Sequence, residues 1–259
     1  MPFKKRIRKS ATYYSTKSWS LKGLSMLIYA FILTSILGVF IYRWVNPNLT
    51  MLMVIRHYEF LFDGKSSGIQ KDWESIDNIS PNMVLAAVAA EDSKFLSHWG
   101  FDFDLIKQAM KHNQRSNRIK GASTISQQTA KNIFLWPRRS WVRKGFEAYF
   151  TLIMETLWPK QRIMEVYLNV VEFGKGVYGV EEASQKFYRK PAARLNRFEC
   201  AMLTTVLPRP SVRNPSNPSS YMYRYQERVL WGMSTIVSVD FDSDNNTLYD
   251  SRRKNKSKR

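Results

Sequence analysis

A run of twenty residues without a charged side chain, residues 23–42, sets the first limit on how this chain can fold. Its sequence is GLSMLIYAFILTSILGVFIY, and a helix of that length spans a hydrocarbon layer of roughly 30 Å at about 1.5 Å of rise per residue. A cleaved signal peptide is the alternative, but no small-x-small cleavage site follows the run before Arg43. The sequence therefore predicts one uncleaved transmembrane helix.

The chain is strongly basic, with 40 Lys and Arg against 21 Asp and Glu and a formal charge of +19. Seven of the basic residues lie in residues 1–22, which contain no acid, and six lie in residues 251–259. Basic residues before a transmembrane helix favour a cytoplasmic N-terminus. We therefore expect a flexible basic cytoplasmic arm over residues 1–22, a membrane anchor, and a remainder outside the cytoplasm that ends in a flexible polar and basic tail over residues 240–259. In a bacterial cell the anchor would lie in the inner membrane and the remainder in the periplasm.

The region outside the membrane divides into two parts. Residues 43–80 form a membrane-proximal segment, whose apolar stretch LTMLMVIRHYEFLF either rests on the lipid surface or forms a strand packed on the domain. From Ser80 onward the apolar spacing is helical, with Pro81 at a first helical position, and no alternating run longer than about five residues stands out. The sequence predicts a mainly α domain over residues 81–239.

Residues 105–146 contain ten Lys or Arg and no Asp or Glu. A solvated helical face usually mixes the two signs, because opposite charges one turn apart stabilise each other. A chance cationic face is the plain interpretation, and a surface that binds an anion is the functional one. No HExxH or CxxC pattern occurs, Cys200 is the only cysteine, and the three histidines lack metal-site spacing, so we predict no metal site.

Inside this acid-free stretch lies KGASTISQQTAKN, in which Ser123 or Thr124 can cap a helix. The free N–H groups of a first helical turn bind anions readily. Gln127 and Lys131 are four residues apart and share a helical face, with Thr124 and Gln128 beside it. This spacing predicts a site for a phosphate-bearing ligand, although it is not a P-loop.

Two glutamates bracket the basic stretch. Glu147 lies four residues after Arg143, and its plain interpretation is an intrahelical ion pair. Glu91 ends an apolar helix, where the negative dipole end raises a carboxyl pKa and makes the carboxylate a better proton acceptor near neutral pH. Two carboxylates with cations between them indicate glycosyl transfer from a phosphate-activated sugar.

Four segments, in order over residues 51–215, are AAEDSKFLSHWGFD, KGASTISQQTAKNIFLW, SWVRKGFEA and KQRIMEVYLNVVEFGKGVYGVEEASQKFY. With them the chain resembles the peptidoglycan glycosyltransferase family, in particular its monofunctional members. The resemblance implies a mainly α, lysozyme-like fold. It also implies polymerisation of lipid II, an undecaprenyl-pyrophosphate-linked disaccharide-pentapeptide, through β-1,4 bonds with inversion and release of undecaprenyl pyrophosphate.

The resemblance also implies residue roles. Glu91 is the general base, and Glu147 is a second catalytic glutamate that tunes the site or organises the pyrophosphate end. Lys131 stabilises the pyrophosphate leaving group, with Arg139 as a second cation, a role for which Arg138 and Arg143 compete. Substrate contacts are implied for Ser123, Thr124, Gln127 and Gln128. Structural roles are implied for Asp92, His98, Gly100 and Asn169.

Two other functions stay open: a lytic enzyme of the same architecture that cleaves glycan, and a non-enzymatic, membrane-tethered basic adaptor. A transpeptidase is not expected, because no KTG occurs and the only S-x-x-K begins at Ser251 in the tail. The expected partners are lipid II, the growing glycan chain, inner-membrane lipids and cell-wall synthesis or division proteins, without nucleic acid. No cofactor is expected to be obligatory, and Mg²⁺ or Mn²⁺ is expected only to stimulate.

Overall fold

The computed structural model describes residues 4–62, 68–116, 121–138, 140–236 and 239–241, and only the backbone of residues 4–21. It divides into two compact units, Met1–Val45 and Asn46–Arg259. Most of the predicted tail, from residue 242 on, lies outside the described residues.

The first unit is helix α1 (Lys4–Tyr42). Its part Lys22–Tyr42 is long and apolar enough to cross a membrane, by length and composition. The helix also includes residues 4–22, for which the sequence predicted a flexible arm. Lys and Arg are good helix formers, and neither Gly nor Pro interrupts residues 4–22.

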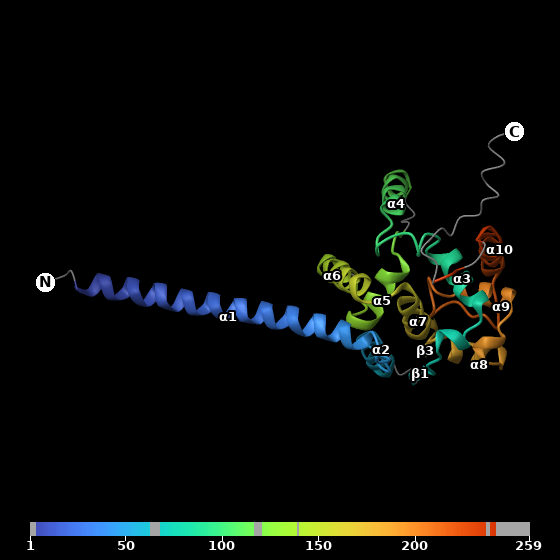
Figure 1. Ribbon diagram of the computed structural model, residues 1–259, viewed down its shortest axis with the longest axis horizontal. Helices are drawn as coiled ribbons and strands as arrows, with labels where there is room; N and C mark the ends of the chain where they lie inside the picture. Colours follow the sequence, from blue (N-terminus) through green and yellow to red (C-terminus); the bar gives the residue numbers. More distant parts are fainter. Residues whose placement is uncertain (1–3, 63–67, 117–120, 139, 237–238, 242–259) are drawn as a thin grey trace. The chain divides into compact units, whose positions relative to one another are not determined.

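The second unit is mainly helical, which confirms the predicted fold class (Figure 1). Its α-helices are α2 (Met51–Phe62), α3 (Pro81–Glu91), α4 (Phe103–Arg115), α5 (Ile125–Phe134), α6 (Trp141–Leu157), α7 (Lys160–Val170), α8 (Val180–Tyr188), α9 (Arg197–Thr204) and α10 (Ser220–Thr235). The short strands β1 (Gln70–Lys71), β2 (Glu172–Gly174) and β3 (Val177–Tyr178) form a sheet in the order β1-β3-β2. Two 3₁₀ turns, Ile76–Asn78 and Ala192–Arg194, complete the described elements.

Helix α5 packs against α6, α7 and α2. Ile125 and Ala130 of α5 are fully buried, and Phe134 stacks on Phe150 of α6 with ring centroids 4.5 Å apart. Helix α7 is buried along most of its length, and α6 is the longest helix of this unit but exposes Trp141 at its start. The centre of this half of the domain is therefore formed by α5 and α7.

The alanine-rich helix α3 packs against α9 and α10 on the other side of the domain (Figure 1). Its small side chains let the neighbouring backbones approach: a Cβ added to Gly232 of α10 would lie 3.3 Å from the Cβ of Ala89. Pro81 occupies the first turn, as predicted, while the Ser80 hydroxyl donates to the Leu195 carbonyl instead of capping the helix. This packing fixes the C-terminal end of α3, where Glu91 lies.

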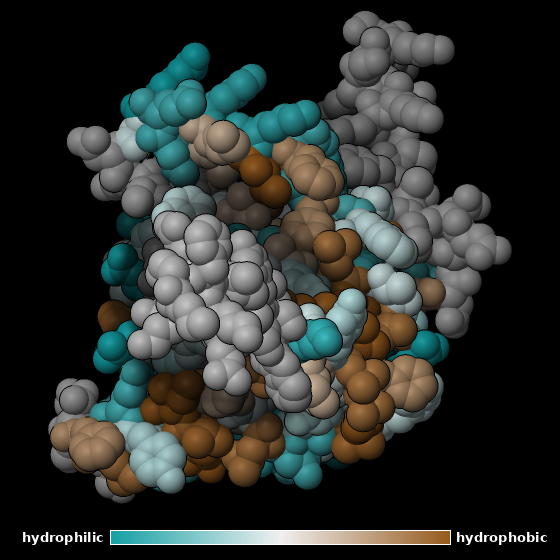
Figure 2. All heavy atoms as spheres, turned by 90° about the vertical axis from the view of Figure 1, so that its left-hand side faces the viewer, coloured by the Kyte–Doolittle hydropathy of each residue, from teal (hydrophilic) through white to brown (hydrophobic). Residues whose placement is uncertain are grey.

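Most of the membrane-proximal segment, from Asn46 onward, lies in the same compact unit as residues 81–239. Its apolar stretch forms α2, and the predicted strand alternative is wrong: Leu52 and Met53 are buried in a helix that packs on α5. Hydrophobic side chains also reach the surface, as the brown groups in Figure 2 show for one face of the molecule. In α2, Met51, Val54 and Phe62 are exposed.

Candidate active site

Glu91 is the last residue of α3, and its side chain is half-buried. The Gln128 amide Nε2 of α5 donates a hydrogen bond to Glu91 Oε2 at 2.8 Å. Burial raises the pKa of the Glu91 carboxyl, and this effect exceeds the opposing effects of the Gln128 hydrogen bond and the Lys131 charge. The structure therefore brings Glu91, Gln128 and Lys131 together, as the sequence predicted.

Asp92 has a different environment from its neighbour. It is buried, its Oδ2 accepts from the Ile125 N–H at 3.0 Å, and both carboxylate oxygens lie within 3.0 Å of His98 Nε2. These contacts join the end of α3 to the start of α5. They agree with the structural role expected for Asp92 and His98.

Replacing Asp92 by Ala is expected to lower the free energy of unfolding by about 3 kcal/mol, because it leaves the Ile125 N–H and His98 without their acceptor. Denaturant titration measures the change. The matched control is Asp104→Ala, since Asp104 is exposed and pairs only at the surface, with Lys94. That control is expected to cost much less, because solvent screens an exposed ion pair. An equal loss in the two variants would remove the structural role from Asp92.

Thr124 and Gln127 form a capping box at the start of α5. The Thr124 N–H donates to Gln127 Oε1 at 3.0 Å, and the Thr124 hydroxyl donates to the Gly100 carbonyl at 2.6 Å. Both side chains are buried, and neither lines the neighbouring cavity. The helix cap uses the Thr124 hydroxyl and Gln127 Oε1, and substrate contact by these two residues stays a prediction.

Gly100 and Asn169 have the structural roles expected of them. Gly100 has a φ of +75°, and a Cβ there would lie 2.6 Å from Thr151 Cγ2. Asn169 Oδ1 accepts from the Glu74 N–H, and its Nδ2 donates to the Glu74 carbonyl, each at 2.8 Å. Asn169 thereby ties the segment before α3 to α7.

A cavity of about 450 Å³ lies beside Gln128 and Lys131. Its lining contains more cations than acids, which favours an anionic ligand. The charged side chains in the lining are Arg56, Lys131, Arg143, Lys144, Glu147 and Glu172. Ser123 and Gln128 also line it, whereas Arg139, the predicted second cation, lies outside the described residues.

The two acids that line this cavity both form ion pairs. Glu147 pairs with Lys144, not with Arg143 as the helical spacing suggested, and Glu172 pairs with Arg56. The Arg143 Nε is buried without a hydrogen-bond partner in the part of the chain that the structure describes. Arg143 therefore has a donor for a ligand in the cavity.

Lys131 is half-buried on the cavity wall. Burial lowers its pKa; Glu147 and Glu91 oppose this, while Arg143 and Arg56 add to it. An anion beside Lys131 would compensate both the burial and the repulsion between the cations. The charge arrangement is therefore suited to a ligand with more than one negative charge.

Arg56 and Glu172 are site residues that sequence reasoning missed. They are 116 residues apart, on α2 and β2, and become neighbours only through the fold. No local pattern identifies them, because the segment around Arg56 suggested lipid contact or a strand. In the described chain, no group of three or more His, Cys, Asp or Glu side chains could hold a metal ion.

A carboxylate with a raised pKa beside a cavity rich in cations is the arrangement of a group-transfer enzyme with an anionic leaving group. The transglycosylase family model matches residues 60–234. The chain belongs to the transglycosylase family, and its helical domain has the lysozyme-like fold expected from the resemblance.

Two relatives illustrate the similarity, and both are named biosynthetic peptidoglycan transglycosylase. The protein of Bdellovibrio bacteriovorus is 48% identical over 218 residues, which cover 84% of this chain and 86% of the relative. That of Cronobacter sakazakii is 50% identical over 207 residues, which cover 80% of this chain and 86% of the relative.

Proposed function

We propose that this chain is a monofunctional peptidoglycan glycosyltransferase. It joins lipid II units into glycan strands by β-1,4 bonds with inversion and releases undecaprenyl pyrophosphate. The observation that carries the proposal is the position of Glu91, hydrogen-bonded to Gln128 at the edge of the cavity that contains Lys131. Family membership and the names of the relatives support the same function.

In the proposed reaction, Glu91 accepts the proton of the acceptor's 4-hydroxyl while that oxygen attacks the anomeric carbon of the donor. The bond from this carbon to the pyrophosphate oxygen breaks, and its electron pair leaves with the pyrophosphate. Lys131 and Arg143, with Arg56 beside them, stabilise the departing charge. A single displacement at the carbon inverts its configuration.

We assign Glu147 to the pyrophosphate end, because its partner Lys144 also lines the cavity. The Ser123 hydroxyl oxygen lies 3.4 Å from Lys144 Nζ and provides a further polar group at the same end of the cavity. No cofactor is obligatory in this proposal, and Mg²⁺ or Mn²⁺ acts only as a stimulant.

The lytic alternative is less well supported, because cleavage of glycan has no pyrophosphate leaving group for the cations to bind. An adaptor has no use for a carboxylate of raised pKa. The test incubates the purified chain separately with lipid II and with preformed glycan. We expect lipid II to be consumed and polymer to form; cleavage of glycan without use of lipid II would overturn the proposal.

The rate is expected to fall on the acid side of its pH profile. Glu91 must be ionised to accept a proton, and burial raises its pKa above the ordinary 4.5. Activity should therefore be lost as pH falls through that raised pKa, with an acid midpoint clearly above 4.5. Initial rates in detergent over a pH series measure this, and a midpoint at or below the ordinary value would contradict it.

The apolar part of α1 is compatible with a single-pass membrane anchor. We propose the inner membrane, with a cytoplasmic N-terminus and a periplasmic domain, since basic residues precede the helix. The exposed apolar face of α2 is suited to lipid contact. We include inner-membrane lipids and cell-wall synthesis or division proteins among the partners, and no nucleic acid.

Removal of residues 1–42 is expected to lower activity on bilayer-embedded lipid II much more than on detergent-dispersed lipid II. The anchor would confine enzyme and substrate to the same surface, which raises their effective concentration. Rates of the full and truncated chains in vesicles and in micelles measure the ratio. An equal loss in both would show that the anchor does not act by placing the domain at the membrane.

A further inference from the structure

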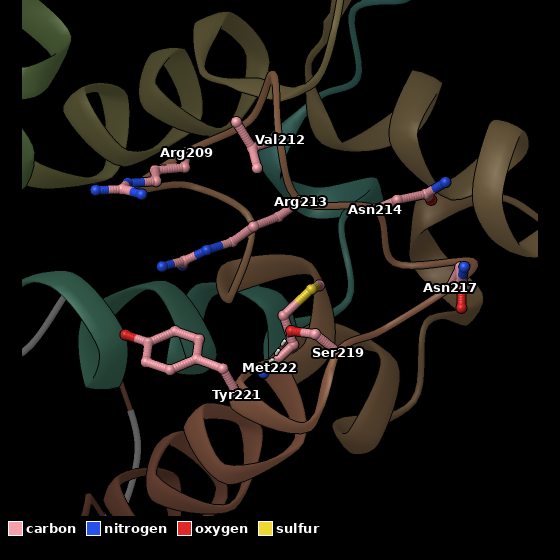
Figure 3. A pocket seen from close by; sticks show the side chains of 8 residues that line it. All are labelled: Arg209, Val212, Arg213, Asn214, Asn217, Ser219, Tyr221 and Met222. Atoms are coloured by element: carbon pink, nitrogen blue, oxygen red, sulfur yellow. Dashed lines mark hydrogen bonds between the residues drawn. The ribbon is translucent and has the colours of Figure 1, made fainter.

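A second cavity, of about 720 Å³, lies between the segment that follows α9 and the first turn of α10 (Figure 3). Arg209, Arg213, Asn214, Asn217, Ser219 and Tyr221 supply its polar groups, and no acid lines it. The side chains of Arg209, Arg213 and Tyr221 extend toward one side of the pocket, and Asn214 and Asn217 lie on the other. Neither the mechanism nor the sequence motifs use this cavity.

Arg213 is held in place by its neighbours. Its guanidinium carbon lies 4.9 Å from the ring centroid of Tyr221 and 6.0 Å from that of Tyr225, and its Nη1 donates to the Thr205 carbonyl. Stacking on aromatic rings leaves the other guanidinium donors available in the plane of the group. Such a fixed cation suits a carboxylate or a phosphate.

The cavity lies near the proposed base. Helix α10 packs on α3, and its Tyr225, whose ring centroid lies 6.0 Å from the Arg213 guanidinium carbon, is within electrostatic range of Glu91. The charges of both Lys131 and Arg213 act on Glu91. Lys131 belongs to the cavity proposed for the leaving group, and Arg213 to the second cavity. Glu91 therefore has a cation of each cavity within electrostatic range.

A displacement between two sugars needs both substrates beside the base. The first cavity is assigned to the donor's pyrophosphate, and the second has its own cations on the side of Arg213, which acts on Glu91. We propose that the Arg209–Arg213 cavity binds an acidic group of the incoming acceptor, a peptide carboxylate or a phosphate. This inference rests on the proposed function. The start of α10 adds N–H groups and has no acid in its first turn, which also favours an anion.

The test measures binding of soluble probes to the full chain in detergent. The first probe is a disaccharide-pentapeptide without lipid or phosphate, the second is the same compound with amidated carboxyl groups, and the third is farnesyl diphosphate. Arg213→Gln and Arg209→Gln are each expected to weaken binding of the first probe by about tenfold, the usual size for a charged hydrogen bond. The amidated probe should bind the wild type about as weakly as the first probe binds these two variants.

Arg224→Gln is the matched control, because Arg224 is exposed on α10 and does not line the cavity. It should leave all affinities unchanged. Arg209 is exposed, so its variant keeps the test valid if Arg213→Gln disturbs the fold through Thr205. Lys131→Ala is expected to weaken the binding of farnesyl diphosphate and to leave the binding of the first probe unchanged.

The outcomes separate the sources of the acidic group. If the two arginine variants bind the first probe more weakly than the wild type does, the cavity binds a peptide carboxylate. If they bind farnesyl diphosphate more weakly, the cavity binds a phosphate. Unchanged affinities for both probes in both variants would overturn the inference. Polymer formation by the wild type is measured separately: polymer with unchanged affinities sinks only this inference, and absence of polymer sinks the proposed function.

Discussion

Glu91→Gln is expected to reduce polymer formation from lipid II by about 10²- to 10⁴-fold, the usual contribution of a general base. Glutamine has nearly the same size and can still accept the hydrogen bond from Gln128, so the change removes mainly the proton acceptor. Glycan product from labelled lipid II, separated by length, measures the loss. Glu227→Gln, an exposed acid on α10, is the control and should retain full activity.

The same variant has a second readout that a structural role would not produce. Because burial raises the pKa of Glu91, the folded chain binds its proton more tightly than the unfolded chain does. At pH values above the raised pKa, ionised Glu91 therefore lowers the free energy of unfolding. This loss disappears at pH values below the ordinary carboxyl pKa. Glu91→Gln should raise the free energy of unfolding at neutral pH. A variant that is both less stable and less active would identify Glu91 as a structural residue instead.

Glu91 and Lys131 could be proposed from sequence because their signals are local. A carboxylate at the end of an apolar helix is unusual, and Lys131 shares a helical face with Gln127 in the segment KGASTISQQTAKN. For Gln127 the spacing indicates the shared helical face with Lys131, but it does not show that Gln127 Oε1 belongs to the helix cap. Thr124 caps the helix as predicted, and its contact with substrate stays a prediction.

The remaining features depend on contacts between distant segments. Arg56 reaches the cavity only because α2 packs on α5, and the pattern of residues 49–62 did not distinguish a helix from a strand. The second cavity combines a proline-rich connection with the start of α10, and nothing in the spacing of Arg209 and Arg213 predicts that they converge. Sequence therefore located the proposed base and leaving-group cation, and the fold was needed for the second cavity.

Lys131→Ala is expected to lower kcat by about 10²- to 10³-fold, because it removes a preorganised charge from the leaving pyrophosphate. Lys107→Ala is the matched control: Lys107 belongs to the same acid-free stretch but is exposed on α4. If the stretch were only a chance cationic face, the two variants would lose activity equally. Initial rates with detergent-dispersed lipid II, at saturating substrate, measure both.

Lys131→Arg separates the charge from the particular side chain. Burial lowers the pKa of Lys131, so wild-type activity should fall as pH rises through that lowered pKa and the ammonium loses its proton. A guanidinium does not titrate in this range. The arginine variant should therefore recover part of the activity lost in Lys131→Ala, and its basic limb should move to higher pH. An unchanged basic limb would mean that a group other than Lys131 produces it.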